Sequence, residues 1–317
     1  MYTRCPSLPA VQMWEVRKTR TLVGVAMTDP VTAQPDISPP EQEQEEPGLD
    51  KDLIPEADHG EKSYEGRDRL SGKRALITGG DSGIGAAVAI AFAREGATVS
   101  LAHLPSEKPD ADHVANLLDD AGVQVHHFPG DLQDHDYRDS LINDAADAMG
   151  GLDILVNNAG RQIAIDDIAE LTDEQVRHTF ETNILAMFTL CRNAVKTMER
   201  GSAIINTTSI QAYQPSPQLI DYASTKAAIN NFTKGLAAQV AEKGIRVNAV
   251  APGPIWTPLQ PSHGQFPEKL PNFGKDTWLG RAGQPAELAP AYVFLATDEA
   301  SYVVGSTIHV NGGEPTP

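Results

Sequence analysis

Residues 74–95 read RALITGGDSGIGAAVAIAFARE, and this stretch decides the fold class. A short apolar run leads into a glycine-rich turn over residues 79–85, and an alanine-rich helical pattern follows at once. Glycines let the backbone approach a pyrophosphate, while the first turn of the helix supplies free N–H groups and the positive end of its dipole. The alternative is an ordinary glycine turn. The order of strand, glycine turn and helix favours a dinucleotide site, formed by Gly79, Asp81, Ser82, Gly83, Ile84 and Gly85.

The same alternation of short apolar runs and longer helical patterns continues to the end of the chain. It predicts strands over residues 74–78, 98–102, 124–128, 154–157, 203–207, 246–251 and 307–310. It predicts helices over residues 84–95, 112–121, 138–149, 173–198, 222–243 and 285–296. Repeated strand and helix units form a parallel sheet covered on both faces. We therefore expect an α/β fold of the Rossmann type over residues 71–317, which is one doubly wound domain with a seven-stranded, mostly parallel sheet.

Residues 1–70 have a different character and are predicted to form an acidic N-terminal arm. Residues 28–70 hold 13 acidic and 4 basic residues, a net charge of −9, and they lack apolar periodicity. Such a segment buries too little apolar surface to offset its chain entropy. We expect the arm to be largely irregular and to become ordered only along another surface, such as a neighbouring subunit. Met27 opens an alternative start, so residues 1–26 either belong to the arm or precede the true start.

The composition excludes several classes of partner. A formal net charge of −18 repels nucleic acid and anionic membranes. No apolar run approaches the roughly 18 residues of a transmembrane helix, and the first 27 residues lack the apolar core of a signal peptide. The two cysteines, Cys5 and Cys191, suit neither a disulfide framework nor a metal site. We expect a cytoplasmic protein that binds no metal and whose partner is a small molecule.

Tyr222 and Lys226 lie four residues apart at the start of a helical pattern, so their side chains leave the same face of the helix. A free tyrosine titrates near pH 10, too high for proton exchange at neutral pH. An adjacent ammonium stabilises the phenolate and lowers the pKa of the phenol toward the working range. Ser209 lies thirteen residues before Tyr222, just beyond a predicted strand, where ligands of open α/β sheets bind. The alternative for the Tyr–Lys pair is a helix surface without chemistry.

Together these motifs resemble the short-chain dehydrogenase/reductase family over residues 72–313. The glycine spacing in Gly79-x-x-x-Gly83-x-Gly85 is that family's variant. Ser209, Tyr222 and Lys226 coincide in order and spacing with its catalytic triad. Asn183 matches the fourth member, which in the family anchors a water that relays protons to the lysine; the alternative for this residue is a backbone-bonding kink. The resemblance implies an NAD(P)-dependent oxidoreductase that moves a hydride between the coenzyme and a small carbonyl or alcohol, with Tyr222 as general acid and base.

Further positions follow from the resemblance. Asp131, with Leu132 after it, matches the contact to the adenine ring, and Asn158-Ala159-Gly160 matches the motif that supports the sheet beside the coenzyme. The stretch that holds the nicotinamide carboxamide corresponds to Pro252, Gly253, Ile255 and Thr257. Substrate contacts are expected from Gln162, Gln211 and Tyr213, which follow the family motifs. The aromatic, Pro- and Gly-rich stretch 257–279 suits a lid, or otherwise an irregular loop or subunit contact.

The choice between the two coenzymes depends on the end of the second strand, where the chain reads LAHLPSEK over residues 101–108. An acidic residue there would bind the ribose hydroxyls, and a basic one would favour the 2′-phosphate of NADP. Neither stands at that position, and His103, Ser106 or Lys108 offers a contact to a phosphate. The sequence therefore favours NADP over NAD, with His103 as a coenzyme contact or, alternatively, a plain loop histidine.

Within the family, the chain resembles a bacterial subgroup with an N-terminal arm. Four stretches carry this closer resemblance: residues 60–64, 79–83, 209–217 and 281–285. Its members are named general stress proteins, glucose/ribitol-type dehydrogenases or NADP-dependent aldehyde reductases. Family members assemble as homotetramers through two long helices, here expected over residues 173–198 and 222–243. Two other functions stay open: an NAD(P)-binding sensor or scaffold without turnover, and an extended-type epimerase or dehydratase, which usually differs in its glycine spacing.

Overall fold

The computed structural model describes residues 28–119 and 122–314. The expectations for residues 1–27, which include Cys5 and the alternative start at Met27, lie outside the described residues, as does the predicted end of the helix over 112–121.

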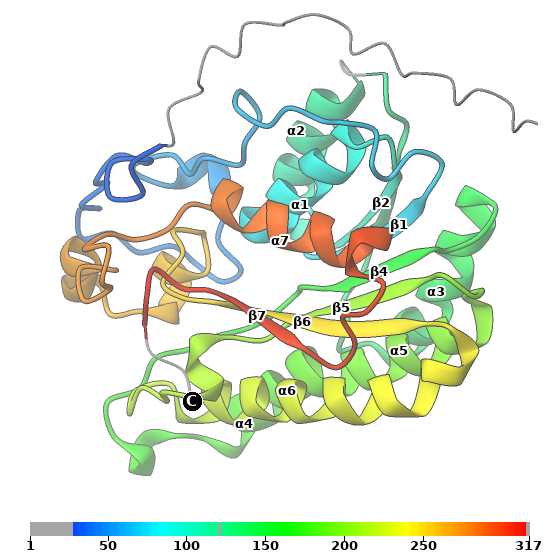
Figure 1. The fold of residues 1–317 in the computed structure, drawn as a ribbon. Coiled ribbons are helices and arrows are strands. Elements are labelled where there is room, and N and C mark those ends of the chain that lie inside the picture. Colours follow the sequence, from blue (N-terminus) through cyan, green and yellow to red (C-terminus); the bar gives the residue numbers. More distant parts are fainter. Residues whose placement is uncertain (1–27, 120–121, 315–317) are drawn as a thin grey trace, which may run out of the picture.

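Seven parallel strands form one sheet in the order β3-β2-β1-β4-β5-β6-β7 (Figure 1). Ala75 on β1 lies opposite Val99 on β2 and Ile154 on β4, so the order of the strands reverses on either side of β1. This reversal opens a crevice at the carboxyl ends of the strands. The strands are β1 (Arg74–Thr78), β2 (Thr98–His103), β3 (Val125–Pro129), β4 (Ile154–Asn157), β5 (Ala203–Thr207), β6 (Arg246–Pro252) and β7 (Thr307–Val310).

Helices cover both faces of the sheet (Figure 1). One layer holds α1 (Gly83–Arg94), α2 (Lys108–Asp119) and α7 (Pro285–Ala296). The other holds α3 (His135–Met149), α4 (Asp173–Phe180), α5 (Ala186–Thr197) and α6 (Ile220–Val240). The predicted doubly wound α/β fold with seven strands is confirmed, and the sheet is parallel throughout rather than mostly parallel.

The helix expected over residues 173–198 is confirmed over residues 173–197, and it contains one irregular turn. A π-helical turn, η4 (Glu181–Leu185), separates α4 from α5. One extra residue in such a turn shifts the helix face, and π turns often occur at functional sites. Asn183 lies inside this turn and is buried.

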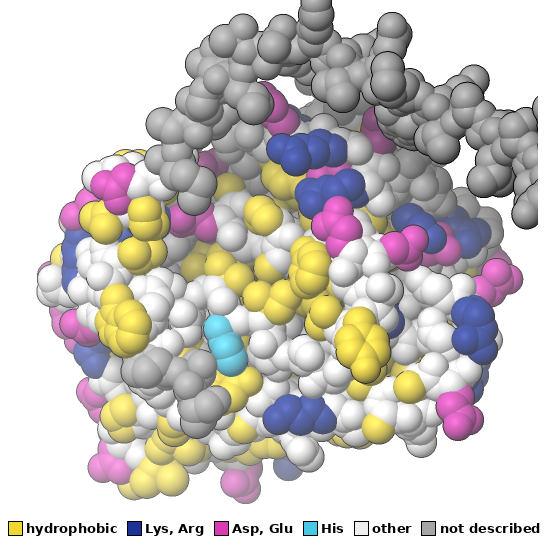
Figure 2. All heavy atoms as spheres, viewed as in Figure 1, with side chains coloured by type: hydrophobic (Ala, Val, Ile, Leu, Met, Phe, Trp, Pro, Cys, Tyr) yellow, Lys and Arg dark blue, Asp and Glu magenta, His cyan; other side chains and the backbone are white. Residues whose placement is uncertain are grey.

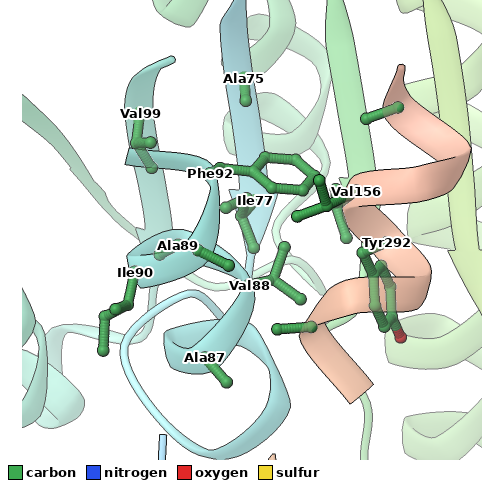
Figure 3. Packing of buried hydrophobic residues seen from close by; sticks show 14 of the residues in the cluster. Ala75, Ile77, Ala87, Val88, Ala89, Ile90, Phe92, Val99, Val156 and Tyr292 are labelled. Carbon is green, nitrogen blue, oxygen red and sulfur yellow. The ribbon is translucent and has the colours of Figure 1, made fainter. Parts of the chain in front are cut away.

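The alanine-rich helix α1 packs on the sheet and lies beside α7 in the same layer (Figure 3). Small side chains such as Ala87 and Ala89 are fully buried, which lets the helix approach its neighbours closely. Phe92 and Tyr292 fill the remaining space against Val156 on β4. This packing fixes the first turn of α1, and with it the glycine turn, relative to the ends of β1 and β4.

Residues 28–70 lie along their own domain, beside the segment that follows β6 (Figure 1). Leu53 packs with Trp256 and Leu270, and the Trp256 indole N–H donates a 2.8 Å hydrogen bond to the Pro55 carbonyl, 201 positions away. A single 3-10 turn, η1 (Asp50–Asp52), interrupts the irregular path. The apolar partner of the arm therefore belongs to the same chain, and an added contact with a neighbouring subunit stays a prediction.

The surface carries charges of both signs. On the face shown in Figure 2, Lys and Arg side chains are separated by acidic and uncharged groups. Within residues 28–119 and 122–314, no helix is both long and apolar enough to cross a membrane.

Candidate active site

A cavity of about 530 Å³ lies at the carboxyl ends of the strands. It collects nearly all of the residues that the sequence singled out. Those that line it are Gly79, Asp81, Ser82, Gly83, Ile84, His103, Asp131, Leu132, Asn158, Ala159, Gly160, Gln162, Ser209, Gln211, Tyr222, Lys226, Pro252, Gly253, Ile255 and Thr257. Gly85, Asn183 and Tyr213 do not line it.

The glycine turn forms a cradle that side chains would fill. Gly79 and Gly83 have φ values of +59° and +47°, in the left-handed region that favours glycine. A Cβ atom on Gly83 would lie 2.9 Å from the Thr257 methyl group. A Cβ atom on Gly85 would lie 1.7 Å from the Gly79 carbonyl oxygen. Gly85 therefore lets α1 approach the backbone of the glycine turn on the side away from the cavity. The cradle and the first turn of α1 fit the pyrophosphate of a dinucleotide.

The motif after β4 holds this turn in place. The backbone N–H groups of Asn158 and Ala159 donate to the Thr78 hydroxyl at 3.0 and 3.1 Å. The Asn158 side-chain amide donates to the Gly79 carbonyl at 3.1 Å. Thr78 therefore links two walls of the cavity. Sequence reasoning missed this role, although the residue stands directly before the quoted glycines.

Ser209, Tyr222 and Lys226 come together on the wall formed by β5 and α6. Tyr222 and Lys226 are 7% and 3% exposed, so the pair is buried at the base of the cavity rather than on a helix surface. The Ser209 side chain is near enough to the phenol to favour its ionised form. The Lys226 ammonium donates to the Thr207 carbonyl at 3.0 Å and lies 5.2 Å from the centroid of the Tyr222 ring.

The expected lowering of the Tyr222 pKa by the ammonium is wrong for this arrangement. Burial raises the pKa of Tyr222 to about 12, and the nearby Ser209 side chain offsets only part of that rise. Burial also lowers the pKa of Lys226 to about 8. At neutral pH the phenol therefore holds its proton and the lysine keeps its charge. The pair is prepared to donate a proton, and the ammonium can stabilise the phenolate that results.

Asn183 lies behind the cavity and connects its walls. Its amide oxygen accepts the Arg161 backbone N–H at 2.8 Å, and its amide nitrogen donates to the Arg161 carbonyl at 2.9 Å. The same nitrogen donates to the Thr225 hydroxyl on α6 at 3.1 Å. The side chain thus binds the backbone of the loop after β4, and it lies in the π turn, so the alternative of a backbone-bonding kink stays open. Its part in a proton relay stays a prediction.

Two carboxyl groups line the cavity near the end of β2: Asp81, which the sequence placed in the dinucleotide site, and Glu107, which it did not. Asp81 is 1% exposed, and neither of its oxygens has a hydrogen-bond partner within the described chain. Burial holds its pKa well above the usual range, and Glu107 raises it further. Burial raises the pKa of Glu107 itself to about 7. The expectation that no carboxylate faces this end is wrong, because the turn at Pro105–Glu107 folds Glu107 back toward the cavity.

His103 also lines this end, but as a neutral contact. It is 5% exposed, and burial lowers its pKa below the ordinary value. Its Nδ1 lies 2.8 Å from the Leu104 carbonyl oxygen. Lys108 does not line the cavity and pairs with Asp112 instead.

The predicted substrate residues separate into two kinds. Gln162 and Gln211 line the cavity, and the Gln162 amide donates to the Gly264 carbonyl at 2.6 Å. Tyr213 does not line it and packs edge-on against His309, with 4.9 Å between the ring centroids. The expected substrate contact of Tyr213 is therefore not present. The turn after Ser209, η5 (Ile210–Ala212), carries the side chain of Tyr213 toward β7.

The segment after β6 forms one rim of the cavity. It contains a π-helical turn, η7 (Gln260–Gly264), and a 3-10 helix, η8 (Pro267–Asn272). Phe273 lines the cavity, whereas Trp278 is 77% exposed. Closure of this segment as a lid stays a prediction.

The arm supplies part of the opposite rim, which sequence reasoning missed. Glu46 and Pro47 line the cavity, and Glu46 pairs with Arg161. Asp50 accepts the backbone N–H of Gly83 at 2.8 Å, so the arm also contacts the glycine turn. The acidic composition of the arm was the only signal in the sequence.

Known proteins resemble this chain in sequence and in fold. A family model described as enoyl-(acyl carrier protein) reductase matches residues 79–314. The uncharacterized oxidoreductase YghA of Escherichia coli K12 is 53% identical over 91% of this chain and 98% of its own length. A glucose and ribitol dehydrogenase of Daucus carota is 43% identical over 87% of this chain and 96% of its own length. The crystal structure of a short chain dehydrogenase from Burkholderia cenocepacia in complex with NADP matches with a TM-score of 0.71 and 32% identity over 77% of this chain and 98% of that one.

Proposed function

The chain belongs to the short-chain dehydrogenase/reductase family and is an oxidoreductase, and we propose that it transfers a hydride between NAD(P) and a small carbonyl or alcohol with Tyr222 as general acid and base. The observation that carries the proposal is the buried phenol of Tyr222, held between Ser209 and Lys226 on the wall of the cavity. The name of the carrot relative supports small polyhydroxylated substrates.

The residues present suit the coenzyme. The glycine cradle and the first turn of α1 would hold the pyrophosphate, Asp131 and Leu132 the adenine side, and residues 252–257 the nicotinamide side. The bound nicotinamide supplies or accepts the hydride. Gln162 links the loop after β4 to the segment after β6 by its hydrogen bond to Gly264, which would fix the two rims relative to each other around the reacting groups.

The protein's own part in carbonyl reduction is proton delivery. Ser209 orients the substrate oxygen and Tyr222, and the phenol donates its proton to that oxygen as the carbonyl carbon is reduced. The phenolate that forms is stabilised by the Lys226 ammonium. Ser209 is itself fixed by the Gln211 backbone N–H, which donates to its hydroxyl at 3.1 Å.

The rate of carbonyl reduction should depend on pH through Lys226. Because burial lowers the pKa of Lys226 to about 8, the ammonium is lost as pH rises through that value, while Tyr222 stays protonated up to about 12. We expect kcat/KM for reduction to be level below about pH 8 and to fall about tenfold per pH unit above it. Initial rates over pH 6–10 at saturating coenzyme would measure this, and a profile that stays level to pH 10 would contradict the assigned role of the lysine.

We favour NADP as the coenzyme, in keeping with the NADP bound to the Burkholderia cenocepacia short chain dehydrogenase in its crystal structure. Glu107 opposes this choice when ionised, because a carboxylate near the ribose repels a 2′-phosphate. Glu107→Gln should therefore tighten NADPH binding about tenfold and leave the Kd of NADH nearly unchanged. The quenching of protein fluorescence gives both constants. Asp119→Asn, which removes an exposed charge from the end of α2 at a position that does not line the cavity, is the matched control, and an equal change for both coenzymes would refute the placement of Glu107.

Turnover distinguishes this proposal from a sensor or scaffold that binds coenzyme without chemistry. The full chain is mixed with NADPH or NADH and a panel of aldehydes, diketones and sugars, and the absorbance of the reduced nicotinamide is followed. Oxidation of coenzyme that depends on the carbonyl supports the enzyme. Tight coenzyme binding without turnover across the panel favours the sensor.

We further propose a cytoplasmic homotetramer that forms through α4, α5 and α6. Leu185 and Phe188 are 43% and 48% exposed at the start of α5, and Phe188 contacts Phe232 on α6 with ring centroids 4.2 Å apart. Large apolar side chains exposed together on neighbouring helices suit a contact between subunits.

A further inference from the structure

The rim of the cavity holds one ion pair that joins the arm to the catalytic domain. Glu46 accepts from the Nε and Nη2 atoms of Arg161 at 2.5 and 3.0 Å, so the contact is a bidentate fork. The side chains of Arg161 and Glu46 are 18% and 38% exposed. Both residues line the same cavity as Tyr222. A substrate that reaches the phenol therefore passes close to this pair.

Arg161 is fixed in place by the residues around it. It follows the loop residue Gly160, where an added Cβ would lie 3.5 Å from the Lys226 ammonium nitrogen. Its backbone N–H and carbonyl are both bound by Asn183. Its Nη1 atom lies 3.5 Å from the Thr179 hydroxyl. The guanidinium group is thus held at a set position next to the reacting groups.

Glu46 is also held rather than free. It stands in a turn in which the Gly48 N–H donates to the Glu45 carbonyl at 2.8 Å. The turn is anchored to the segment after β6, since the Gln44 N–H donates to the Pro261 carbonyl at 2.9 Å. Gly48, with φ +78°, packs so closely there that a Cβ atom would lie 3.0 Å from the Pro258 carbonyl oxygen. The carboxylate therefore reaches Arg161 from a fixed turn.

The pair sets the charge at this rim. Among the described residues that line the cavity, Arg161 and Lys226 are the two Lys or Arg side chains, and Lys226 is directed at the Thr207 carbonyl. An unpaired guanidinium would bind a carboxylate with two parallel hydrogen bonds. Glu46 occupies that fork and cancels its charge. A hydroxyl group suits the paired rim better, because it can donate to the carboxylate and accept from the guanidinium.

We propose that Glu46 is a specificity-determining residue: by occupying Arg161 it makes the cavity accept neutral, hydroxylated carbonyl substrates and reject carbonyls that carry a carboxylate. This inference rests on the proposed function, since it assigns a substrate class to the same cavity. It also gives the acidic arm a part in recognition.

The test compares glyceraldehyde, which is neutral and hydroxylated, with succinic semialdehyde, which carries a carboxylate. In Glu46→Gln we expect kcat/KM for succinic semialdehyde to rise at least about tenfold, mainly through a lower KM, and that for glyceraldehyde to fall severalfold. Glu45→Gln makes the same change of charge one residue away, at a position that does not line the cavity, and should change neither value. Glu46→Gln combined with Arg161→Gln should lose the gain.

A binding measurement separates this inference from the proposed function. Succinate is titrated calorimetrically into the protein with coenzyme bound. It should bind Glu46→Gln at least about tenfold more tightly than the unchanged chain or the Glu45→Gln variant. An unchanged ratio of the two substrates together with unchanged succinate binding would overturn the inference, as would an equal gain in Glu45→Gln. If the unchanged chain turns over no carbonyl at all, the proposed function fails, while calorimetry still decides the role of Glu46.

Discussion

Replacing Tyr222 with phenylalanine should reduce carbonyl turnover by about a thousandfold and leave coenzyme binding nearly unchanged. The variant keeps the ring, its packing and the position of Lys226, and it loses only the hydroxyl next to Ser209. General acid catalysis contributes about 10²–10⁴-fold to a rate, so its loss should be large. Initial rates with NADPH and an aldehyde measure the first effect, and coenzyme titration measures the second.

Tyr213→Phe is the matched control for this experiment. It removes the same atom from a tyrosine near the same motif, but Tyr213 packs against His309 and does not line the cavity. Its activity should stay within about twofold of the unchanged chain, because it supplies no proton to the substrate. If Tyr222→Phe keeps more than about a tenth of the activity, or if Tyr213→Phe loses as much, Tyr222 is not the general acid.

Replacing Gly85 with alanine should weaken coenzyme binding by at least about a hundredfold and lower the Tm of the protein. The added Cβ would lie 1.7 Å from the Gly79 carbonyl oxygen and 2.8 Å from the Asn158 side-chain nitrogen. Backbone at the glycine turn must therefore move, and it is the same backbone that would hold the pyrophosphate. Fluorescence titration with NADPH and a thermal melt measure the two effects.

Gly235→Ala on α6 separates the local clash from a general effect of replacing glycine. No heavy atom lies within 4 Å of its added Cβ, and the residue is exposed within a helix. Alanine favours a helix over glycine by about 1 kcal/mol, so this variant should be slightly more stable and bind coenzyme normally. Normal coenzyme affinity in Gly85→Ala would show that the turn does not hold the dinucleotide as described.

Periodicity was sufficient to predict the sheet, because each strand is short, apolar and followed by a turn. All seven strands lie within about one residue of their expected bounds. The helix over residues 173–198 was also predicted, but the π turn inside it was not. A π turn keeps the apolar pattern on both sides, and the residue that marks it, a buried Asn183, reads equally well as a polar residue in an ordinary helix.

The active site could be predicted where it depends on order along the chain. The glycine turn, Ser209, Tyr222 and Lys226 lie where parallel topology brings the carboxyl ends of strands together. The pKa of Tyr222 could not be predicted from spacing, because it depends on burial rather than on the lysine alone. Glu107 was overlooked for a related reason: a short turn, rather than sequence distance, returns it to the cavity.

Contacts between segments far apart in the chain were the hardest to predict from the sequence. Glu46 and Arg161 are separated by 115 positions, and no pattern in either segment indicates the other. The indole of Trp256 binding the Pro55 carbonyl is of the same kind.

The N-terminal arm therefore forms part of the wall of the cavity. Grafting only the doubly wound unit of this protein onto the leader of a relative would transfer Tyr222 and the glycine turn, but it would leave behind the carboxylates of Glu46 and Asp50. A chimera cut near residue 71 would therefore test whether the arm carries the substrate preference of its parent.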